Sequence, residues 1–183
     1  EASERAEEFL EDQMKNHDSA GGVIECVITG VPAGIGDPVF GKLDAALAQA
    51  VMSIGAVKGV EIGSGFVAAK KRGSENNDEF CINEDGMVDK KTNFAGGILG
   101  GISDGSPIVL RAAFKPTPSI FADQGTVNQS GEEIRVQIKG RHDPVIVPRA
   151  VVGVEAMAAL TIADALLMGM GSRVDMVKEA YSR

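Results

Sequence analysis

Two short proline-containing segments carry side chains that could bind an anion or move a proton. Residues 115–119 read Lys-Pro-Thr-Pro-Ser; the prolines stiffen the backbone and remove amide donors, so a cation and two hydroxyls must make the polar contacts. Residues 140–144 read Gly-Arg-His-Asp-Pro, in which Arg141 could pair with a phosphate or carboxylate and Asp143 could relay a proton. The first set suits a phosphate monoester. For both segments the alternative is a stiff strand end with solvated charges.

A third segment is rich in glycine. Five glycines stand between positions 96 and 105, and without a Cβ they let the backbone approach a ligand closely and present amide donors. No Gly-Lys-Ser/Thr follows, and the Gly-x-Gly-x-x-Gly spacing is missing, so neither a P-loop nor a dinucleotide fold is indicated. The alternative is a glycine-rich turn that leads into the next strand.

Composition narrows the class of protein. The 183 residues have the length of one domain, and a net charge of −8 argues against a general nucleic-acid or anionic-membrane binder. Cys26 and Cys81 share no Cys-x-x-Cys spacing, and two histidines cannot build a histidine-rich metal site. We therefore expect a single domain, residues 1–183, without a metal site.

The run from position 150 to 170 is almost continuously apolar and long enough to cross a bilayer. It contains Glu155 and Asp164, and an Asp near the centre of a membrane helix costs about 2.5–3.5 kcal/mol. Its many alanines suit close helix packing, so we expect a core or interface helix and no membrane partner. No secretory leader opens the sequence, which predicts a cytoplasmic location.

Hydrophobic periodicity predicts the elements that must position these segments. Alternating or β-branched runs predict four strands, at 23–29, 58–68, 108–114 and 133–139. Helical spacing predicts four helices, at 1–16, 39–53, 150–170 and 173–181. Asp37 should cap the second helix, with Pro38 in its first turn, and the polar stretch 70–91 suggests a mobile or functional loop. Because helices and strands do not alternate strictly, we expect an α+β fold with a four-stranded antiparallel sheet covered by helices.

Six motifs, taken together, resemble the chorismate synthase family. They stand in the family's order and spacing at residues 30–45, 53–61, 72–79, 92–105, 115–119 and 140–144. The resemblance covers essentially the whole chain and implies the C-terminal half of enzymes about twice as long; the missing initiating Met agrees with this expectation. It also implies one half of a β-α-β sandwich, in which each half supplies an antiparallel sheet flanked by helices, in a homotetramer.

The resemblance further implies an activity and its residues. Members convert 5-enolpyruvylshikimate 3-phosphate to chorismate by a 1,4-elimination of phosphate, in the shikimate pathway to aromatic amino acids. The reaction needs reduced FMN, without net redox change. By motif, the FMN site would be lined by Gly55, Ala56, Gly100, Lys115, Pro116, Thr117, Pro118, Ser119 and Arg141. Arg141 would also lie near the substrate, and Asp143 would assist proton movement at the flavin.

The chain departs from the family pattern in two ways that matter for function. Gly55 stands where many relatives have a larger residue, so only a backbone contact could persist there. The half that the resemblance does not cover brings two essential histidines and most of the substrate-binding arginines, and neither His17 nor His142 matches those histidines. We therefore expect the isolated chain to be inactive. The alternative is a non-catalytic anion- or flavin-binding or oligomerisation module.

Overall fold

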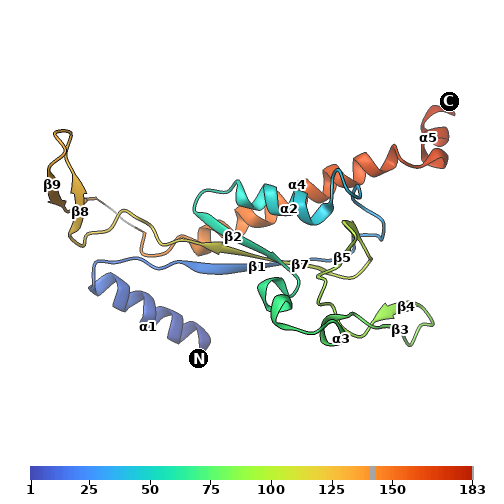
Figure 1. Cartoon of the computed structure of the whole chain (residues 1–183), viewed down its shortest axis with the longest axis horizontal. Helices are drawn as coiled ribbons and strands as arrows, with labels where there is room; N and C mark the ends of the chain where they lie inside the picture. The colour runs from blue at the N-terminus through green and yellow to red at the C-terminus, as the bar shows by residue number, and fades with distance from the viewer. Residues whose placement is uncertain (141–142, 183) are drawn as a thin grey trace.

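A computed structural model describes residues 1–140 and 143–182 and has a central three-stranded sheet (Figure 1). Its antiparallel strands lie in the order β1 (Gly22–Ile28), β7 (Ile108–Phe114) and β2 (Val57–Ile62). Side chains of a strand point alternately to its two faces, so one face of the central strand forms core. The buried residues of β7 are Ile108, Leu110, Ala112 and Phe114. The strands predicted at these three places are confirmed.

Two helices cover one face of this sheet (Figure 1). α2 (Leu43–Met52) and α4 (Val147–Met170) contact each other, and they pack on β2 and β1 respectively. Each helix presents one apolar stripe at helical spacing. The buried residues of the two stripes are Leu43, Leu47, Val51, Val154, Ala158 and Ile162. The core of the molecule therefore lies between these two helices and the sheet.

α4 has the length and apolar composition of a membrane-spanning helix, and among the described helices it alone meets both conditions. A single such helix is weak evidence for a membrane span, because the core helix of a soluble protein passes the same test. Only 17% of its most apolar window is buried, since one stripe faces the core while Leu160, Leu167 and Met168 are exposed. The buried stripe agrees with the predicted packing helix, and the exposed stripe is an apolar surface that has no cover within the described residues.

The two terminal helices lie where the periodicity predicts them. They are α1 (Ala2–Lys15) and α5 (Val174–Tyr181), and neither buries a residue. Figure 1 shows α5 at the end of the molecule opposite the hairpin of β8 (Gln124–Val127) and β9 (Glu133–Val136). Both helices therefore contribute little to the core.

The fourth predicted strand forms but does not join the central sheet. β9 pairs antiparallel with β8 in a separate hairpin that projects from one end of the molecule (Figure 1). The side-chain oxygen of Asn128 closes the turn by accepting the N–H groups of Ser130 and Glu132, at 2.9 and 3.0 Å. Closing this short loop costs less chain entropy than pairing with a distant strand. The α+β class is confirmed, but the central sheet has three strands where four were expected.

β2 is shorter than predicted. It ends at Ile62 and not at position 68, because Gly63 and Gly65 adopt left-handed φ angles of 56° and 52°. The chain then turns into the 3-10 helix η1 (Gly65–Lys70), and Phe66 is exposed instead of sharing the strand's inner face. The glycines, which allow this turn, outweigh the apolar alternation.

α2 begins later than predicted. Asp37 and Gly41 exchange both backbone hydrogen bonds, at 3.0 and 2.9 Å, in a tight turn that precedes the helix. Lys42 is the N-cap, so the expected cap at Asp37 and helical Pro38 are wrong. A local turn closed by two hydrogen bonds has replaced the first turn of helix that the Asp-Pro pair suggested.

The polar stretch 70–91 folds into short elements. They are α3 (Gly73–Asn76), β3 (Phe80–Ile82) and β4 (Val88–Lys90), of which the two strands form a hairpin. A second small hairpin, of β5 (Ile98–Leu99) and β6 (Ile102–Ser103), follows in the glycine segment. These two hairpins lie near the end of the sheet at which β7 begins (Figure 1).

Candidate functional site

The loop that leaves β7 and the loop that enters β2 meet at one end of the sheet. The Lys115 N–H donates a hydrogen bond of 2.9 Å to the Ala56 carbonyl, so two predicted site segments are in contact. Ala56 has a φ of 72°, a left-handed conformation that costs a residue with a Cβ about 1–2 kcal/mol. Apart from Gly55 itself and its two chain neighbours, no described residue has an atom within 4 Å of the place where a Cβ on Gly55 would stand. Backbone strain beside open space is typical of functional sites.

The start of β1 supports residues 115–119. A Cβ on Gly21 would stand 3.1 Å from Pro116 Cδ and would collide with the Phe114 carbonyl, so glycine is what allows the proline loop to approach. The Ser19 hydroxyl donates a hydrogen bond of 2.7 Å to the Thr117 carbonyl. The loop 115–119 is therefore held by the close packing of Pro116 against Gly21 and by the hydrogen bond from Ser19.

Thr117 carries an unused polar group. Its hydroxyl oxygen is buried and has no hydrogen-bond partner among the described residues. A buried hydroxyl left unpaired costs about 1–3 kcal/mol, so a ligand group that bonds to it would remove that cost. The exposed Lys115 ammonium begins the same loop. The loop thus offers a cation and a hydroxyl to an anionic group.

Asp143 and Ser119 line the same cavity, of about 210 Å³, beside the end of α1. His17 and Phe121 line another part of it, with ring centroids 6.0 Å apart. The carboxylate of Asp143 is 35% exposed and pairs with the Arg149 guanidinium at 2.8 Å. The cavity therefore contains the carboxylate of Asp143, which the guanidinium of Arg149 holds in place. A carboxylate is a group that can take part in proton transfer.

The backbone next to Asp143 is anchored to the residue that precedes β1. The Pro144 carbonyl accepts the Ala20 N–H at 2.8 Å, and Ala20 bridges to Val145 in parallel. Arg141 and His142 lie outside the described residues, so the predicted contacts of Arg141 with flavin and substrate stay predictions.

Gly100 lies apart from these residues. It forms the tip of the β5–β6 hairpin, and the carbonyl of its neighbour Gly101 accepts the Leu43 N–H at 2.8 Å. Leu43 begins α2, whereas Ala56 follows its other end, and a ten-residue helix is about 15 Å long. The structure thus gathers residues 55–56, 115–119 and 143 at one end of the sheet and does not bring Gly100 to them.

Two other glycines of the cluster serve close backbone packing. A Cβ on Gly96 would stand 2.5 Å from the Gly63 nitrogen, and one on Gly97 would stand 2.6 Å from the Pro107 carbonyl oxygen. The Gly96 and Gly97 N–H groups are bonded to Asn93, at 3.1 Å to its carbonyl and 2.8 Å to its side-chain oxygen. Their amides are therefore not free for a ligand, and the structure favours the turn interpretation for these two residues.

Sequence reasoning missed two residues that hold the site. Arg149, the partner of Asp143, lies in the first turn of α4, which Pro148 helps to begin. The Pro-Arg pair shortly after Asp143 was the signal that could have found it. Ser19, the partner of the Thr117 carbonyl, is 98 positions away in sequence, and no local pattern marks it.

The chain is an α+β protein with a cation, hydroxyls and a paired carboxylate at one end of its sheet, and comparisons with known proteins give its family. The family model described as chorismate synthase matches residues 1–167. A chorismate synthase of Lachnoclostridium phytofermentans is 67% identical over 183 residues, covering 100% of this chain. One of Archaeoglobus fulgidus is 65% identical over 152 residues, 82% of this chain. The chain belongs to the chorismate synthase family.

A solved structure supports the same assignment and confirms the predicted fold. It is titled "Crystal Structure of Chorismate Synthase", is 36% identical, covers 98% of this chain and has a TM-score of 0.75. The chain spans about half the length of its relatives: 50% of the Lachnoclostridium protein, 42% of the Archaeoglobus protein and 47% of the solved chain. The activity of the whole protein is therefore a matter of proposal for this chain.

Proposed function

We propose that this chain acts as the C-terminal half of a chorismate synthase. The reaction is the 1,4-elimination of phosphate from 5-enolpyruvylshikimate 3-phosphate to give chorismate, with reduced FMN as cofactor. The observation that carries the proposal is the convergence of residues 55–56, 115–119 and 143 at one end of the sheet, since these segments are far apart in sequence. The family assignment and the half-length match support the same reading.

The residues at this end of the sheet fit a flavin mononucleotide. Thr117 has a buried hydroxyl without a described partner, Lys115 is an exposed cation, and open space lies beside Gly55. A phosphate group would pair with the cation and accept a hydrogen bond from the hydroxyl. Pro116, Pro118 and Ser119 complete the loop that would hold it, while Arg141 and Gly100 remain predicted contacts. When bound, reduced FMN would supply electron density for the departure of phosphate without net redox change.

The chain's own residues would bind the anion and handle a proton. Cations and hydroxyls near the leaving phosphate stabilise the negative charge that develops on it. Asp143, held at 2.8 Å by Arg149, would assist proton movement where the flavin would bind. Two essential histidines and most of the substrate arginines are expected from the half that this chain does not cover. The isolated chain is therefore expected to be catalytically inactive.

An anaerobic assay with reduced FMN and 5-enolpyruvylshikimate 3-phosphate tests this proposal. The 183-residue chain alone should give no chorismate, and adding the N-terminal half of the Lachnoclostridium enzyme should restore turnover. An Asp143→Asn variant in the reconstituted enzyme should lose most of its activity. Turnover by the isolated chain would show that it needs no second half. Full activity of the reconstituted Asp143→Asn variant would remove Asp143 from the mechanism.

A second function, a non-catalytic flavin-binding module, is favoured by the unpaired Thr117 hydroxyl and the neighbouring cavity. Titration of FMN against the isolated chain, followed by flavin fluorescence, separates it from the first. Tight binding that Lys115→Ala abolishes and Lys178→Ala leaves unchanged supports a self-contained site. No binding by the chain, with binding after reconstitution, supports the half-enzyme.

The remaining expectations concern assembly and location. We infer a homo-oligomer, a tetramer by family resemblance, in which the second half of the enzyme covers the exposed stripe of α4. We also infer a cytoplasmic location, with a small-molecule substrate and neither a nucleic acid nor a membrane as partner. The Lachnoclostridium and Archaeoglobus relatives are biosynthetic enzymes of a bacterium and an archaeon, which supports this location.

A further inference from the structure

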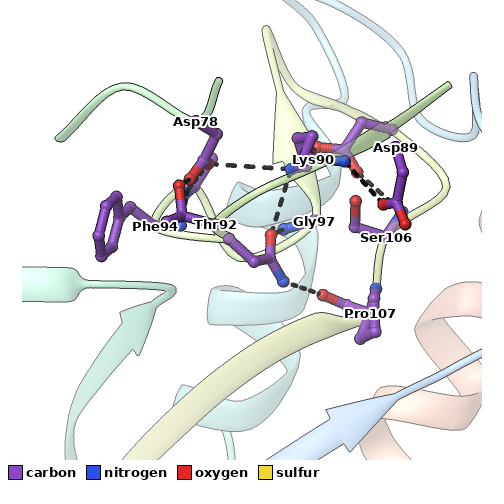
Figure 2. A network of polar contacts seen from close by, with 11 residues as sticks. Asp78, Asp89, Lys90, Thr92, Phe94, Gly97, Ser106 and Pro107 are labelled. Atoms are coloured by element: carbon purple, nitrogen blue, oxygen red, sulfur yellow. Dashed lines mark hydrogen bonds and ion pairs between the residues drawn. The ribbon is translucent and has the colours of Figure 1, made fainter. Parts of the chain in front are cut away.

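Three charged side chains are buried together away from the candidate site. Asp78, Lys90 and Asp104 expose only 5%, 4% and 10% of their side chains. The Lys90 ammonium lies 2.7 Å from the Asp104 carboxylate and 3.8 Å from that of Asp78, and it donates to the Asn93 side-chain oxygen at 3.2 Å. Figure 2 shows Lys90 between Asp78 on one side and Ser106 on the other. The ammonium is therefore shared among oxygens from separate segments.

Each carboxylate also accepts hydrogen bonds from residues that flank the glycines, at positions 92–95 for Asp78 and at position 106 for Asp104. Asp78 accepts the N–H groups of Phe94 and Ala95, at 2.7 and 2.9 Å, and the Thr92 hydroxyl at 2.7 Å. Burial alone would raise the pKa of Asp78, but these hydrogen bonds, led by that from Ala95, and the nearby Lys90 charge hold it below its ordinary value. Asp78 is thus a charged anchor for the backbone that precedes the glycines.

Asn93 and Asp104 extend the network to the far end of the glycine segment. The Asn93 side chain accepts the Gly97 N–H at 2.8 Å and donates to the Pro107 carbonyl at 2.8 Å. Asp104 accepts the Ser106 N–H at 2.9 Å, and the Lys90 hydrogen bond helps to keep its pKa low although burial would raise it. The network therefore spans residues 93–107, which contain the β5–β6 hairpin, and is tied to β4 through Lys90.

We propose that Lys90 is a built-in counter-ion and that the Asp78–Lys90–Asp104 triad is a latch that holds the β3–β4 hairpin and the glycine segment as one rigid unit. Without the ammonium, two carboxylates and the Asn93 oxygen would face one another in a buried site, where repulsion is poorly screened. Release of the glycine segment from the hairpin would relieve that repulsion. Among the described residues, no hydrogen bond or ion pair joins the triad to residues 55–56, 115–119 or 143, so the inference stands apart from the proposed function.

The structure offers a way to test charge rather than packing. A groove of about 360 Å³, lined by Phe80, Lys90, Asp104 and their neighbours, opens beside the ammonium. A small amine can enter by this groove and replace the ammonium that a Lys90→Ala variant lacks. Rescue by methylammonium is a response that loss of side-chain packing alone would not give.

Hydrogen–deuterium exchange on the 183-residue chain is the experiment. In Lys90→Ala, amides of residues 94–106 should exchange about tenfold faster or more, while those of β7 keep their protection. Methylammonium should restore slow exchange, and tetramethylammonium, which lacks N–H donors, should not. The control is Lys91→Ala, whose ion pair with Glu79 is 56% and 70% exposed and whose loss should change exchange less than about twofold.

Two results would overturn the latch. One is unchanged exchange at 94–106 in Lys90→Ala, and the other is faster exchange that methylammonium does not reverse. If Lys90→Ala does not fold, Lys90→Gln replaces it, since the amide keeps most of the side-chain length without the charge. Slow exchange at 94–106 in a folded Lys90→Gln would likewise reject the proposal.

Discussion

Ser103 joins the strand of the small β5–β6 hairpin to the loop before α2. Its side chain is 2% exposed, and its hydroxyl donates to the Pro32 carbonyl at 2.6 Å while accepting the Ile35 N–H at 2.9 Å. The backbone of Ser103 also bonds this loop, since its carbonyl accepts the Gly34 N–H at 2.7 Å and its N–H donates to the Ile35 carbonyl at 2.8 Å. Residues of this kind determine loop positions that backbone propensity leaves open.

Ser103→Ala should therefore destabilise the chain by about 1–3 kcal/mol, because it removes the two hydrogen bonds of a buried hydroxyl, each worth about 0.5–1.5 kcal/mol. Urea unfolding followed by circular dichroism measures the change. Ser53→Ala is the control: that exposed hydroxyl bonds the Ala50 carbonyl at 2.6 Å at the end of α2, and its loss should cost well under about 1 kcal/mol. Equal losses for the two variants would show that burial of Ser103 is unimportant.

The Asp78–Lys90–Asp104 triad predicts that the free energy of unfolding falls in acid. The pKa values of Asp78 and Asp104 are lowered in the folded chain, so their stabilisation is complete above the unfolded carboxyl pKa of about 3.9 and is lost as pH falls through the lower folded values. Asp78→Asn should cost about 2–3 kcal/mol at pH 7. The difference in the free energy of unfolding between wild type and Asp78→Asn should disappear below about pH 4.

Urea unfolding at several pH values between 3 and 7 checks this expectation. Asp175→Asn is the control, because the carboxylate of Asp175 is exposed and its pairing with Arg173 is screened by water. That variant should follow the wild-type pH dependence. The difference in unfolding free energy between wild type and Asp78→Asn could instead stay constant down to pH 3. That result would contradict the conclusion that Asp78 is charged in the folded chain.

At the scale of elements, two glycine turns with similar backbones have different surroundings. Gly63 ends β2 with a φ of 56°, and a Cβ there would collide with the Phe94 carbonyl of the glycine segment. Gly86 turns the β3–β4 hairpin with a φ of 76°, and no described atom lies within 4 Å of its Cβ position. The first glycine serves both conformation and contact, and the second serves conformation alone.

The two positions make a matched pair of substitutions. Gly86→Ala should cost about 1–2 kcal/mol, which is the left-handed penalty alone. Gly63→Ala should cost about 1–3 kcal/mol more, since the segments must separate to admit the methyl group. Thermal unfolding of both variants measures the difference. Equal costs would show that the β2 turn and the glycine segment are not packed as described.

Element boundaries show where local patterns succeed. The runs at β1 and β7 and the apolar spacing of α4 were correctly predicted, because each element turns one apolar face toward the core. β2 and α2 were predicted too long, because left-handed glycines and the Asp37–Gly41 turn interrupt patterns that apolar spacing alone continues. The pairing of β9 with β8 depends on the turn that the Asn128 side chain closes. Assigning strands from apolar alternation alone does not detect this turn.

On the scale of the whole molecule, the outer stripe of α4 is an exposed apolar surface. Leu160, Leu167 and Met168 expose 65%, 68% and 72% of their area on a helix whose other stripe is core. Contiguous apolar surface of this kind mediates association when it is not covered. If the chain acts as half of a chorismate synthase, as we propose, the other half of the enzyme would cover this stripe.

The isolated chain should therefore self-associate, and a Leu160→Glu/Leu167→Glu variant should be monomeric at the same concentration. Sedimentation velocity measures both states. Val127→Glu, on the exposed β8–β9 hairpin, is the control for added charge and should associate like wild type. A monomeric wild-type chain, or an associated double variant, would place the association surface elsewhere than on α4.

The sequence by itself determined the family and the α+β class and marked the segments that we propose to carry the chemistry, because motifs and periodicity are local properties of the chain. Only the tertiary structure decided which segments meet. It joined residues 55–56, 115–119 and 143, left Gly100 at the other end of α2, and supplied Ser19 and Arg149 as supports. It also turned the polar stretch 70–91, expected as a mobile or functional loop, into a hairpin tied down by a buried lysine. Contacts between distant residues depend on how the faces of the sheet and the helices pack, and one-dimensional spacing does not contain that information.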